Sequence, residues 1–431
     1  MEINYLYERY LANPSIETDS RKIKKGDIFF ALKGPNFNGN LYAQQALADG
    51  AAYCIVDEET GFSDERIIQV NDSLETLQAL AKKHREQFSI PFIAITGSNG
   101  KTTTKELIHA VLSARYKTYT TVGNLNNHIG IPLTILKVKP DAEMAVVEMG
   151  ANHQKEIEGY CRYTLPTHGL ITNCGKAHLE GFGGEEGVRK GKGELFDFLR
   201  KNNGSAFIYK DYDYLVEMSK GISSVISYGT TDADITGEEI IHQEASELLQ
   251  VKITKGAAIG EIKTQLVGGY NLPNVLAAVC IGKTFQVNES RITEALENYT
   301  PSNSRSQLIE KDGNKIILDA YNANPSSMKA AVENFAQMPG TKKVLILGGM
   351  MELGTESIPE HAALVNLISQ HEWHNIVLVG KDYLNLPAHF IHFLNVNEAS
   401  HWYREQHLTD AQVLIKGSRS MQMEKVLDGV S

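Results

Sequence analysis

A glycine-rich turn that joins an apolar segment to a predicted helix constrains this chain more than any other feature. Apolar β-forming residues run from Ile90 to Ile95, and apolar residues recur at helical spacing from Lys101 to Arg115. A strand, a loop and a helix in this order let backbone N–H groups and the positive helix end converge on a phosphate. The residues expected to contact that phosphate are Gly97, Ser98, Asn99, Gly100, Lys101, Thr102 and Thr103.

The loop is a variant of the phosphate-loop pattern G-x-x-x-x-G-K-[ST], because Ile95 stands where the first glycine belongs. A glycine turn before an ordinary helix is the alternative interpretation. The pair Lys101-Thr102 directly after Gly100 favours phosphate binding, since the lysine can reach the outer phosphates and the hydroxyl can meet Mg²⁺. We therefore predict a nucleotide-binding loop in an α/β sheet.

The rest of the pattern predicts an α/β protein of three domains, as 431 residues allow at about 150 residues per domain. A small mixed N-terminal domain is expected over 1–85. A central P-loop ATPase α/β domain is expected over 86–300, including a short-strand meander over 222–267. Alternating strands and helices predict a doubly wound, Rossmann-like domain over 301–431. Gly348-Gly349 follows a strand there, but G-x-G-x-x-G is absent and NAD is not expected.

Composition excludes several functional classes. The formal net charge of −10 argues against sequence-independent nucleic-acid binding, which needs a basic face. The four cysteines show no C-x-x-C spacing, which favours reduced thiols in the cytoplasm. No apolar run approaches the roughly 18 residues that a membrane span needs. We expect a cytoplasmic protein that neither binds nucleic acid nor spans a membrane.

Polar residues follow two further predicted strands of the central region. The strand Met144–Val147 runs into Glu148, and the strand Gly169–Thr172 leads to His178. Ligands of open α/β sheets bind at the carboxyl ends of strands, so both side chains could hold a metal near the phosphates. The combination indicates an enzyme in which two metals act on a nucleoside triphosphate. For His178 alone, an ordinary loop histidine is the simpler interpretation.

Other polar residues have both a structural and a functional interpretation. The carboxamide of Asn127 could hold a substrate or a transferring phosphoryl group, or serve a turn. Lys192 lies at a basic helix opening, where a solvated lysine is usual. Asn271 follows two glycines and could contact adenine or cap a helix. Ser20-Arg21 could bind a phosphate, although a solvated turn explains the pair from chemistry alone.

Several motifs together resemble the Mur ligase family. In chain order they are Thr96–Thr103, Glu148-Met149-Gly150, Ala177–Glu180, Gly191–Glu194 and Tyr270-Asn271-x-x-Asn274. Further stretches resemble the family member that adds D-alanyl-D-alanine, namely Asn124–Leu133, Asp319–Met328, Gly348–Gly354 and Leu414–Met421. The resemblance covers all three predicted domains.

The resemblance implies an ATP-dependent ligase of peptidoglycan precursor synthesis. Its substrates would be UDP-N-acetylmuramoyl-tripeptide and D-alanyl-D-alanine. ATP would phosphorylate the terminal carboxylate of the tripeptide, and the free amine of the dipeptide would displace phosphate from the resulting acyl phosphate. The resemblance also implies a cytoplasmic monomer.

Site roles follow from the same resemblance. Lys101 would stabilise the transferring phosphoryl group, while Thr102 and Glu148 would hold the Mg²⁺ that bridges the outer phosphates. His178 would bind a second Mg²⁺. Lys192 would be carbamylated by CO₂ and support that second ion. The expected catalytic residues are Lys101, Asn127, His178 and Lys192, and the expected metal ligands are Thr102, Glu148, His178 and Lys192.

The C-terminal domain would complete the nucleotide site. Asn271 would contact adenine, Arg305 the phosphates and Asp319 the ribose or phosphate side, which implies that the C-terminal domain closes onto the central one. Ser20 and Arg21 would lie at the UDP end of the substrate. The candidates around the incoming dipeptide are Asn322, Asn324, Lys416 and Ser418.

The chain departs from the family pattern at three places. Asn38-Gly39-Asn40 stands where Asp-Gly-His is frequent, Gly349 where an aspartate is common and Ser304 where a glycine is common. The alternatives within the family and near it are a sister ligase that adds a diamino acid to UDP-N-acetylmuramoyl-dipeptide, and folylpolyglutamate synthase. No Asp-Asn-Pro-Arg motif supports the sister ligase. An alternative of a different class is a P-loop nucleotide switch.

Overall fold

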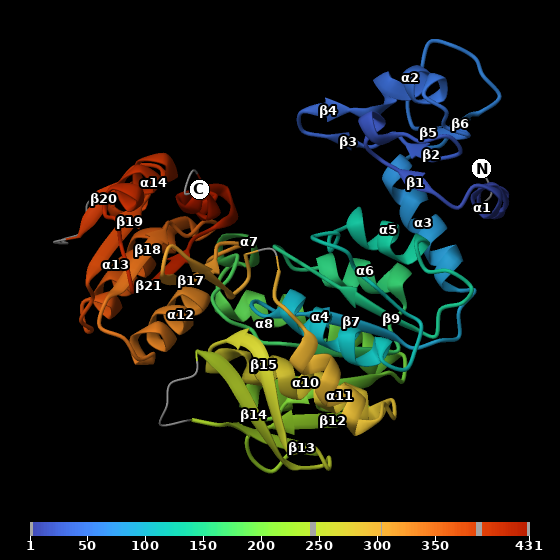
Figure 1. The fold of residues 1–431 in the computed structure, drawn as a ribbon. Helices are drawn as coiled ribbons and strands as arrows, with labels where there is room; N and C mark the ends of the chain where they lie inside the picture. The colour runs from blue at the N-terminus through green and yellow to red at the C-terminus, as the bar shows by residue number, and fades with distance from the viewer. Residues whose placement is uncertain (1–2, 242–246, 303, 385–389, 429–431) are drawn as a thin grey trace.

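Three sheets organise the computed structural model, which describes residues 3–241, 247–302, 304–384 and 390–428. A four-stranded, a nine-stranded and a six-stranded sheet follow one another along the chain, and Figure 1 shows each in a body of its own. The three-domain α/β fold predicted from the sequence is confirmed. The boundaries at residues 85 and 300 stay predictions. Among the described residues, no helix is long and apolar enough to cross a membrane.

The N-terminal sheet is parallel and small. Its order is β1 (Ile16–Glu17), β2 (Ile28–Phe30), β5 (Tyr53–Val56) and β6 (Ile67–Gln69), and α2 (Ala43–Ala48) contributes to a separate apolar cluster with it. A short hairpin of β3 (Lys33–Gly34) and β4 (Phe37–Asn38) extends from this domain. Figure 1 shows that the sheet lies apart from the other two domains.

Helices α1 (Ile3–Ala12) and α3 (Ser73–Arg85) attach the N-terminal sheet to the central domain. The Tyr7 hydroxyl is 3.1 Å from Nδ1 of His84, and Nε2 of the same ring is 2.7 Å from the Val138 carbonyl. The Arg85 guanidinium donates to the carbonyls of Thr164 and Leu165 at 2.9 and 3.0 Å. These buried polar contacts fix α3 on the central domain.

The Asn38-Gly39-Asn40 turn has a structural function in this chain. Asn40 Nδ2 donates to Asp57 Oδ1 at 2.8 Å, and Asn40 Oδ1 accepts from the Asp57 amide at 3.0 Å. Asn38 Nδ2 donates to Glu58 at 2.7 Å. The first departure from the family pattern therefore ties the turn to the end of β5.

The central sheet has the order β15-β14-β13-β12-β11-β10-β7-β9-β8. Parallel strands run from β8 (Thr118–Thr120) through β9 (Met144–Glu148), β7 (Phe92–Thr96), β10 (His168–Ile171) and β11 (Ser205–Tyr209) to β12 (Ser224–Gly229). β13 (Ile235–Glu239) still pairs in parallel with β12. The antiparallel meander is formed by β13, β14 (Leu248–Lys255) and β15 (Glu261–Val267).

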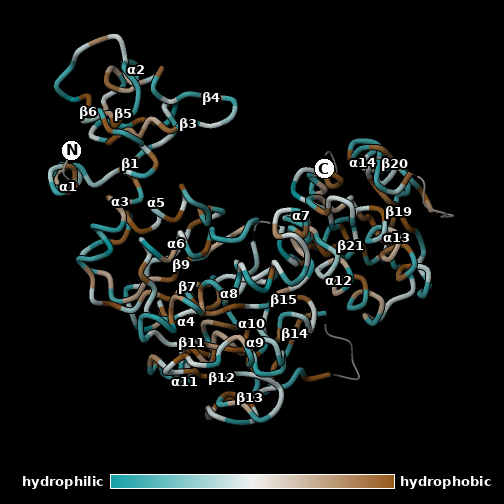
Figure 2. Tube along the Cα trace, turned by 180° about the vertical axis from the view of Figure 1, so that it is seen from behind, coloured by the Kyte–Doolittle hydropathy of each residue, from teal (hydrophilic) through white to brown (hydrophobic). Residues whose placement is uncertain are grey.

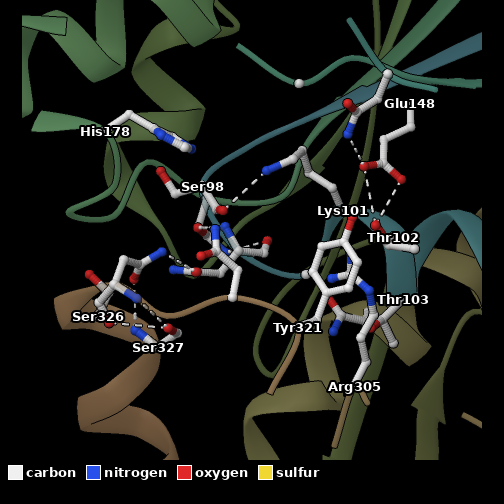
Figure 3. Close-up of a pocket in the computed structure, with 18 of the residues that line it drawn as sticks. Ser98, Lys101, Thr102, Thr103, Glu148, His178, Arg305, Tyr321, Ser326 and Ser327 are labelled. Atoms are coloured by element: carbon white, nitrogen blue, oxygen red, sulfur yellow. Dashed lines mark hydrogen bonds between the residues drawn. The ribbon is translucent and has the colours of Figure 1, made fainter. Parts of the chain in front are cut away.

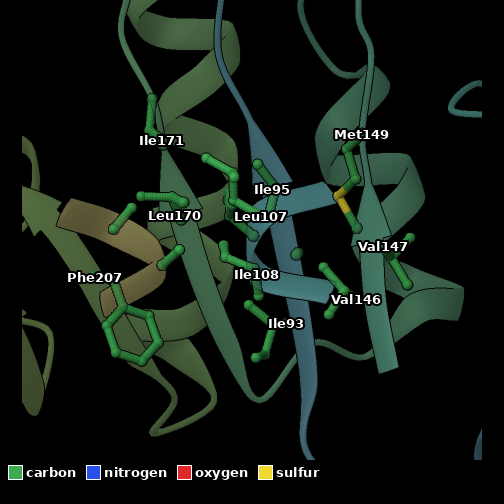
Figure 4. Close-up of a cluster of buried hydrophobic side chains, with 14 of the residues drawn as sticks. Ile93, Ile95, Leu107, Ile108, Val146, Val147, Met149, Leu170, Ile171 and Phe207 are labelled. Carbon is green, nitrogen blue, oxygen red and sulfur yellow. The ribbon is translucent and has the colours of Figure 1, made fainter. Parts of the chain in front are cut away.

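The phosphate-loop strand β7 lies inside this sheet, between β10 and β9, and is buried along its whole length. Its aliphatic residues pack against α4 (Lys101–Ser113) and the neighbouring strands, as Figure 4 shows for Ile93, Ile95, Leu107 and Ile108. Helix α10 (Leu272–Thr284) covers α4. The loop after β7 is therefore anchored at both ends in the core.

The C-terminal sheet has the order β16-β17-β21-β18-β19-β20, with only β16 antiparallel. The strands are β16 (Gln307–Lys311), β17 (Asn314–Asp319), β18 (Lys343–Gly348), β19 (Asn375–Val379), β20 (Ile391–Phe393) and β21 (Gln412–Lys416). The helices are α12 (Pro325–Gln337), α13 (Ser357–Ile368) and α14 (Val396–Glu405). Figure 2 shows hydrophobic segments recurring along strands and helices of each domain.

Candidate active site

A pocket of about 570 Å³ lies between the central and C-terminal domains. Figure 3 shows His178 and Glu148 at opposite ends of the phosphate-loop residues, with Ser326 near Ser98 and with Tyr321 and Arg305 near Thr102 and Thr103. It brings together most of the predicted site residues: Ser98, Asn99, Gly100, Lys101, Thr102, Thr103, Asn127, Glu148, His178, Asn271, Arg305, Asp319, Asn322, Asn324 and Lys416. The predicted site residues that do not line it are Ser20, Arg21, Gly97, Lys192 and Ser418.

Two glycines are required by the shape of the phosphate loop. Gly97 has φ 143°, and a Cβ there would lie 2.0 Å from the Thr172 hydroxyl. Gly100 has φ 78° and precedes the first residue of α4. The loop is bound to the end of β10, since the Ser98 amide donates to the Asn173 carbonyl at 2.9 Å. The turn is therefore held against the end of β10, with the N-terminus of α4 open to the pocket.

A carboxylate, a hydroxyl and a carboxamide meet beside this helix end. The Thr102 hydroxyl lies 3.1 and 2.9 Å from the two carboxylate oxygens of Glu148, and Asn126 Nδ2 donates to Glu148 Oε1 at 2.7 Å. Mg²⁺ prefers oxygen ligands of this kind, and it commonly binds one or two carboxylates together with nucleotide phosphates. The residues present therefore fit a magnesium ion that accompanies the nucleotide.

Two cations face the phosphate loop. Burial lowers the pKa of Lys101 to about 8, with Arg305 also lowering it and Glu148 opposing the shift. Lys101 Nζ donates to the carbonyls of Gly97 and Ser98 at 2.6 and 3.1 Å. The Arg305 guanidinium stacks on the Tyr321 ring, 3.5 Å from its centroid. This arrangement concentrates positive charge from two domains where phosphates would lie.

His178 lines the pocket, whereas Lys192 is buried outside it. The His178 ring pairs through Nδ1 with Glu352 of the C-terminal domain, and in Figure 3 it lies across the pocket from Glu148. Lys192 is 1 % exposed and donates to the Ala151 carbonyl at 3.1 Å. Within the described ranges, no group of three or more His, Cys, Asp or Glu side chains forms a metal site.

The C-terminal domain supplies an ion pair to the pocket. Asp319 pairs with Lys416, and its other carboxylate oxygen accepts from the Ser306 amide at 3.1 Å. Ser418 is buried beside the Gly349 carbonyl, to which its amide donates at 3.2 Å. A Cβ at Gly349 would lie 3.0 Å from the Asp382 carboxylate. In this chain Asp382 therefore occupies the space beside the position where the family commonly has an aspartate.

Three predicted carboxamides are already engaged in hydrogen bonds. Asn127 Oδ1 accepts from the amides of Ile129 and Gly130 at 3.1 and 2.9 Å. Asn271 Nδ2 donates to the Val267 carbonyl at 2.9 Å, and its Oδ1 accepts from Asn274. Asn324 caps α12. All three line the pocket, and their contact with a ligand stays a prediction.

The N-terminal pair does not reach the pocket. The Arg21 guanidinium binds both carboxylate oxygens of Asp19 at 2.8 Å and stays exposed. The sequence reasoning also missed residues that line or reach the pocket, namely Asn126, Tyr270, Ser306, Tyr321 and Glu352. Four of them stand inside stretches that resembled the family, and three of these are next to predicted residues: Asn126 precedes Asn127, Tyr270 precedes Asn271 and Tyr321 precedes Asn322. Their position next to predicted residues is the signal that could have identified these three.

Comparisons with known proteins agree with this geometry. Sequence models of three Mur ligase domains match: the "Mur ligase family, catalytic domain" over 14–85, the "Mur ligase middle domain" over 95–282 and the "Mur ligase, glutamate ligase domain" over 304–419. A Bacillus subtilis protein named UDP-N-acetylmuramoyl-tripeptide–D-alanyl-D-alanine ligase is 32 % identical, over 97 % of this chain and 94 % of its own.

Solved structures match over nearly the whole chain as well. MurF from Acinetobacter baumannii has a TM-score of 0.86 at 30 % identity, covering 96 % of this chain and 93 % of its own. MurF ligase from Thermotoga maritima in complex with ADP has a TM-score of 0.87 at 26 % identity, covering 97 % of each chain. The chain belongs to the Mur ligase family.

Proposed function

We propose that this protein is an ATP-dependent ligase that joins D-alanyl-D-alanine to UDP-N-acetylmuramoyl-tripeptide through an acyl phosphate. The observation that supports it most is the interdomain pocket, in which the phosphate loop and Glu148 face Arg305, Asp319 and Lys416 of the C-terminal domain. Relatives with this substrate pair in their names match over nearly the full length. We expect the protein to act as a cytoplasmic monomer in peptidoglycan precursor synthesis.

ATP would bind with its phosphates on the loop from Gly97 to Thr103. The loop amides and the N-terminus of α4 face that position, and the Lys101 and Arg305 cations balance the charge of the transferring phosphoryl group. Thr102 and Glu148 would hold Mg²⁺, which shields the outer phosphates when bound. The Thermotoga relative was solved with ADP, which supports a nucleotide in this pocket. Asn271 is the candidate contact for the adenine of the nucleotide, and Asp319 is the candidate on its ribose side.

The chemistry needs activation because a carboxylate resists attack by an amine. A carboxylate oxygen of the tripeptide attacks the γ-phosphorus, the bond to the bridging oxygen breaks and ADP leaves. The dipeptide amine then attacks the acyl carbon, and the tetrahedral intermediate expels inorganic phosphate with loss of a proton. Closure of the C-terminal domain keeps water from the acyl phosphate.

His178 and a carbamylated Lys192 are proposed for the acceptor side. A carbamate would replace the buried ammonium with a carboxylate-like group and so add an oxygen ligand for a second Mg²⁺. Asn127 is proposed to contact the transferring phosphoryl group or the substrate. Ser20 and Arg21 are proposed at the UDP end.

On the dipeptide side we propose Asn322, Lys416 and Ser418. The Asn322 backbone lies near Lys416, whose Nζ is 3.4 Å from its carbonyl. Both amide ends of Asn324 are already bound to protein atoms, which argues against a direct contact with the dipeptide.

Phosphate release with ATP and Mg²⁺ tests the proposal. Turnover is expected with UDP-N-acetylmuramoyl-tripeptide plus D-alanyl-D-alanine, and not with UDP-N-acetylmuramoyl-dipeptide plus lysine or diaminopimelate. Turnover with the second pair alone would identify the sister ligase. Hydrolysis that is slow and indifferent to both substrates would identify a nucleotide switch instead.

A further inference from the structure

The first turn of α12 contacts two loops of the central domain at once. Asn324 Nδ2 donates to Asn99 Oδ1 in the phosphate loop at 2.7 Å. The Ser326 hydroxyl accepts from the Lys176 amide at 2.9 Å, in the loop that leads to His178. Figure 3 shows Ser326 and Ser327 next to the Ser98 side of the pocket. The C-terminal domain therefore touches the phosphate loop itself, through one side chain.

The orientation of the Asn324 amide is fixed by its helix. Asn324 Oδ1 accepts from the Ser327 amide at 2.9 Å, and the Ser327 hydroxyl lies 3.1 Å from the Asn324 amide, so the two form a capping box. Because the oxygen faces an N–H donor, the NH₂ group must face Asn99. The NH₂ group of Asn324 thus points at the phosphate loop whenever α12 lies against the central domain.

The backbone of Asn99 is held by the central domain. Its amide donates to Asn173 Oδ1 at 3.0 Å, and its carbonyl accepts from the Thr172 hydroxyl at 2.6 Å and from Asn173 Nδ2 at 3.1 Å. Its side-chain oxygen binds the C-terminal domain instead. This residue thus joins the anchored loop to the domain that must close.

We propose that Asn324 is a positioning residue that couples closure of the C-terminal domain to the conformation of the phosphate loop. The contact forms only when α12 is docked, which is also the arrangement that places Arg305 and Asp319 in the pocket. Phosphoryl transfer then occurs on a phosphate loop that both domains hold by hydrogen bonds. The inference rests on the proposed ligase function, because the ligase reaction is the reason that the C-terminal domain must close.

Asn324→Ser tests the contact, since serine still caps a helix but is too short to reach Asn99. Loss of one hydrogen bond is expected to lower kcat for ligation roughly 3- to 10-fold. Asn395→Ser is the matched control, because Asn395 caps α14 in the same domain and is exposed. The control should leave kcat unchanged.

The same substitution in an Asn99→Ala background separates coupling from a general structural effect. If the contact transmits closure, Asn324→Ser will cause no further loss of kcat when Asn99 lacks its side chain. An equal loss in both backgrounds would overturn the proposal.

A distance measurement tests the coupling without any ligase activity. Fluorophores on cysteines introduced at Lys201 and Gln406 report closure, because the four native cysteines are buried. With ATP and Mg²⁺, Asn324→Ser should raise the ratio of open to closed molecules roughly 3- to 10-fold. An unchanged ratio would refute the inference. A wild-type protein that closes but ligates nothing would refute the proposed function instead.

Discussion

Replacing Lys192 with alanine is expected to lower kcat for ligation by about 10³-fold, the scale of losing a group that supports charge in phosphoryl transfer. Burial, with the Lys101 cation as the next cause, lowers the pKa of Lys192 to about 7. A neutral lysine amine can add CO₂ with release of one proton, and the proposed carbamate would be an oxygen ligand. The exposed Lys201 at the end of the same helix, α8 (Glu185–Lys201), offers Lys201→Ala as a control, with unchanged turnover.

Chemical rescue distinguishes a carbamate from a packing role. Alanine leaves space beside the Ala151 carbonyl, and formate or acetate bound there would supply the missing carboxylate. Added formate should therefore restore part of the activity of Lys192→Ala, and none of the activity of Lys192→Met, whose side chain fills the space. Full activity of the alanine variant without any additive would exclude the carbamate.

The pH dependence follows from the same lowered pKa. Below about pH 7 the Lys192 amine is protonated and cannot add CO₂, whereas above it the neutral amine predominates. Carbamylation at limiting CO₂ should therefore rise as the pH increases through about 7. It is measured as incorporation of ¹³C-labelled CO₂ in the wild-type protein, with Lys192→Ala as the blank.

Replacing Glu148 with glutamine is expected to lower turnover by about 10²-fold or more while the fold is kept, because a neutral amide is a poor ligand for Mg²⁺. The variant keeps the size of the side chain and an oxygen that can accept from Thr102 or Asn126. Half-maximal activity should therefore need a much higher Mg²⁺ concentration, with little change in thermal unfolding.

The matched control for this substitution is Glu217→Gln, because Glu217 is exposed and pairs with Lys220 on the surface. Its Mg²⁺ dependence should equal that of the wild type. Should Glu148→Gln also keep the wild-type Mg²⁺ dependence, Glu148 would have no part in binding the metal.

The phosphate loop was predictable because local chemistry determines it. A buried strand, glycines at positive φ and a lysine at the helix start are all encoded within residues 90–104, and the structure has them in that arrangement. Glu148 was predictable for a similar reason, since it is the last residue of β9, the strand next to β7. In both cases the sheet itself brings the residues together.

Contacts between domains were not predictable from local pattern. Asn99 and Asn324 are 225 residues apart, and nothing near either asparagine indicates the other. The pairing of His178 with Glu352 is of the same kind. The burial of Lys192 was missed because a basic helix opening usually faces solvent, whereas here Val188, Leu195 and Lys192 share the buried face of α8.

Some C-terminal elements were missed for a related reason. Neither β16, whose residues are mostly half-buried or exposed, nor the short edge strand β20 was predicted from the sequence. Edge strands have one neighbour and little apolar burial, so their hydrophobic alternation is weak. The central strands β17, β18 and β21 belong to the alternating strands and helices that were predicted over 301–431, and β17 and β21 end at Asp319 and Lys416.

Transfer of oxygen from substrate to phosphate tests the acyl-phosphate route most directly. UDP-N-acetylmuramoyl-tripeptide labelled with ¹⁸O at both oxygens of its terminal carboxylate is incubated with ATP, Mg²⁺ and D-alanyl-D-alanine. The ¹⁸O content of the products is then measured by mass spectrometry. We expect one ¹⁸O atom in each inorganic phosphate and one in the new amide carbonyl. Ligation that releases phosphate without ¹⁸O would contradict the account, because the carboxylate would then never have been phosphorylated.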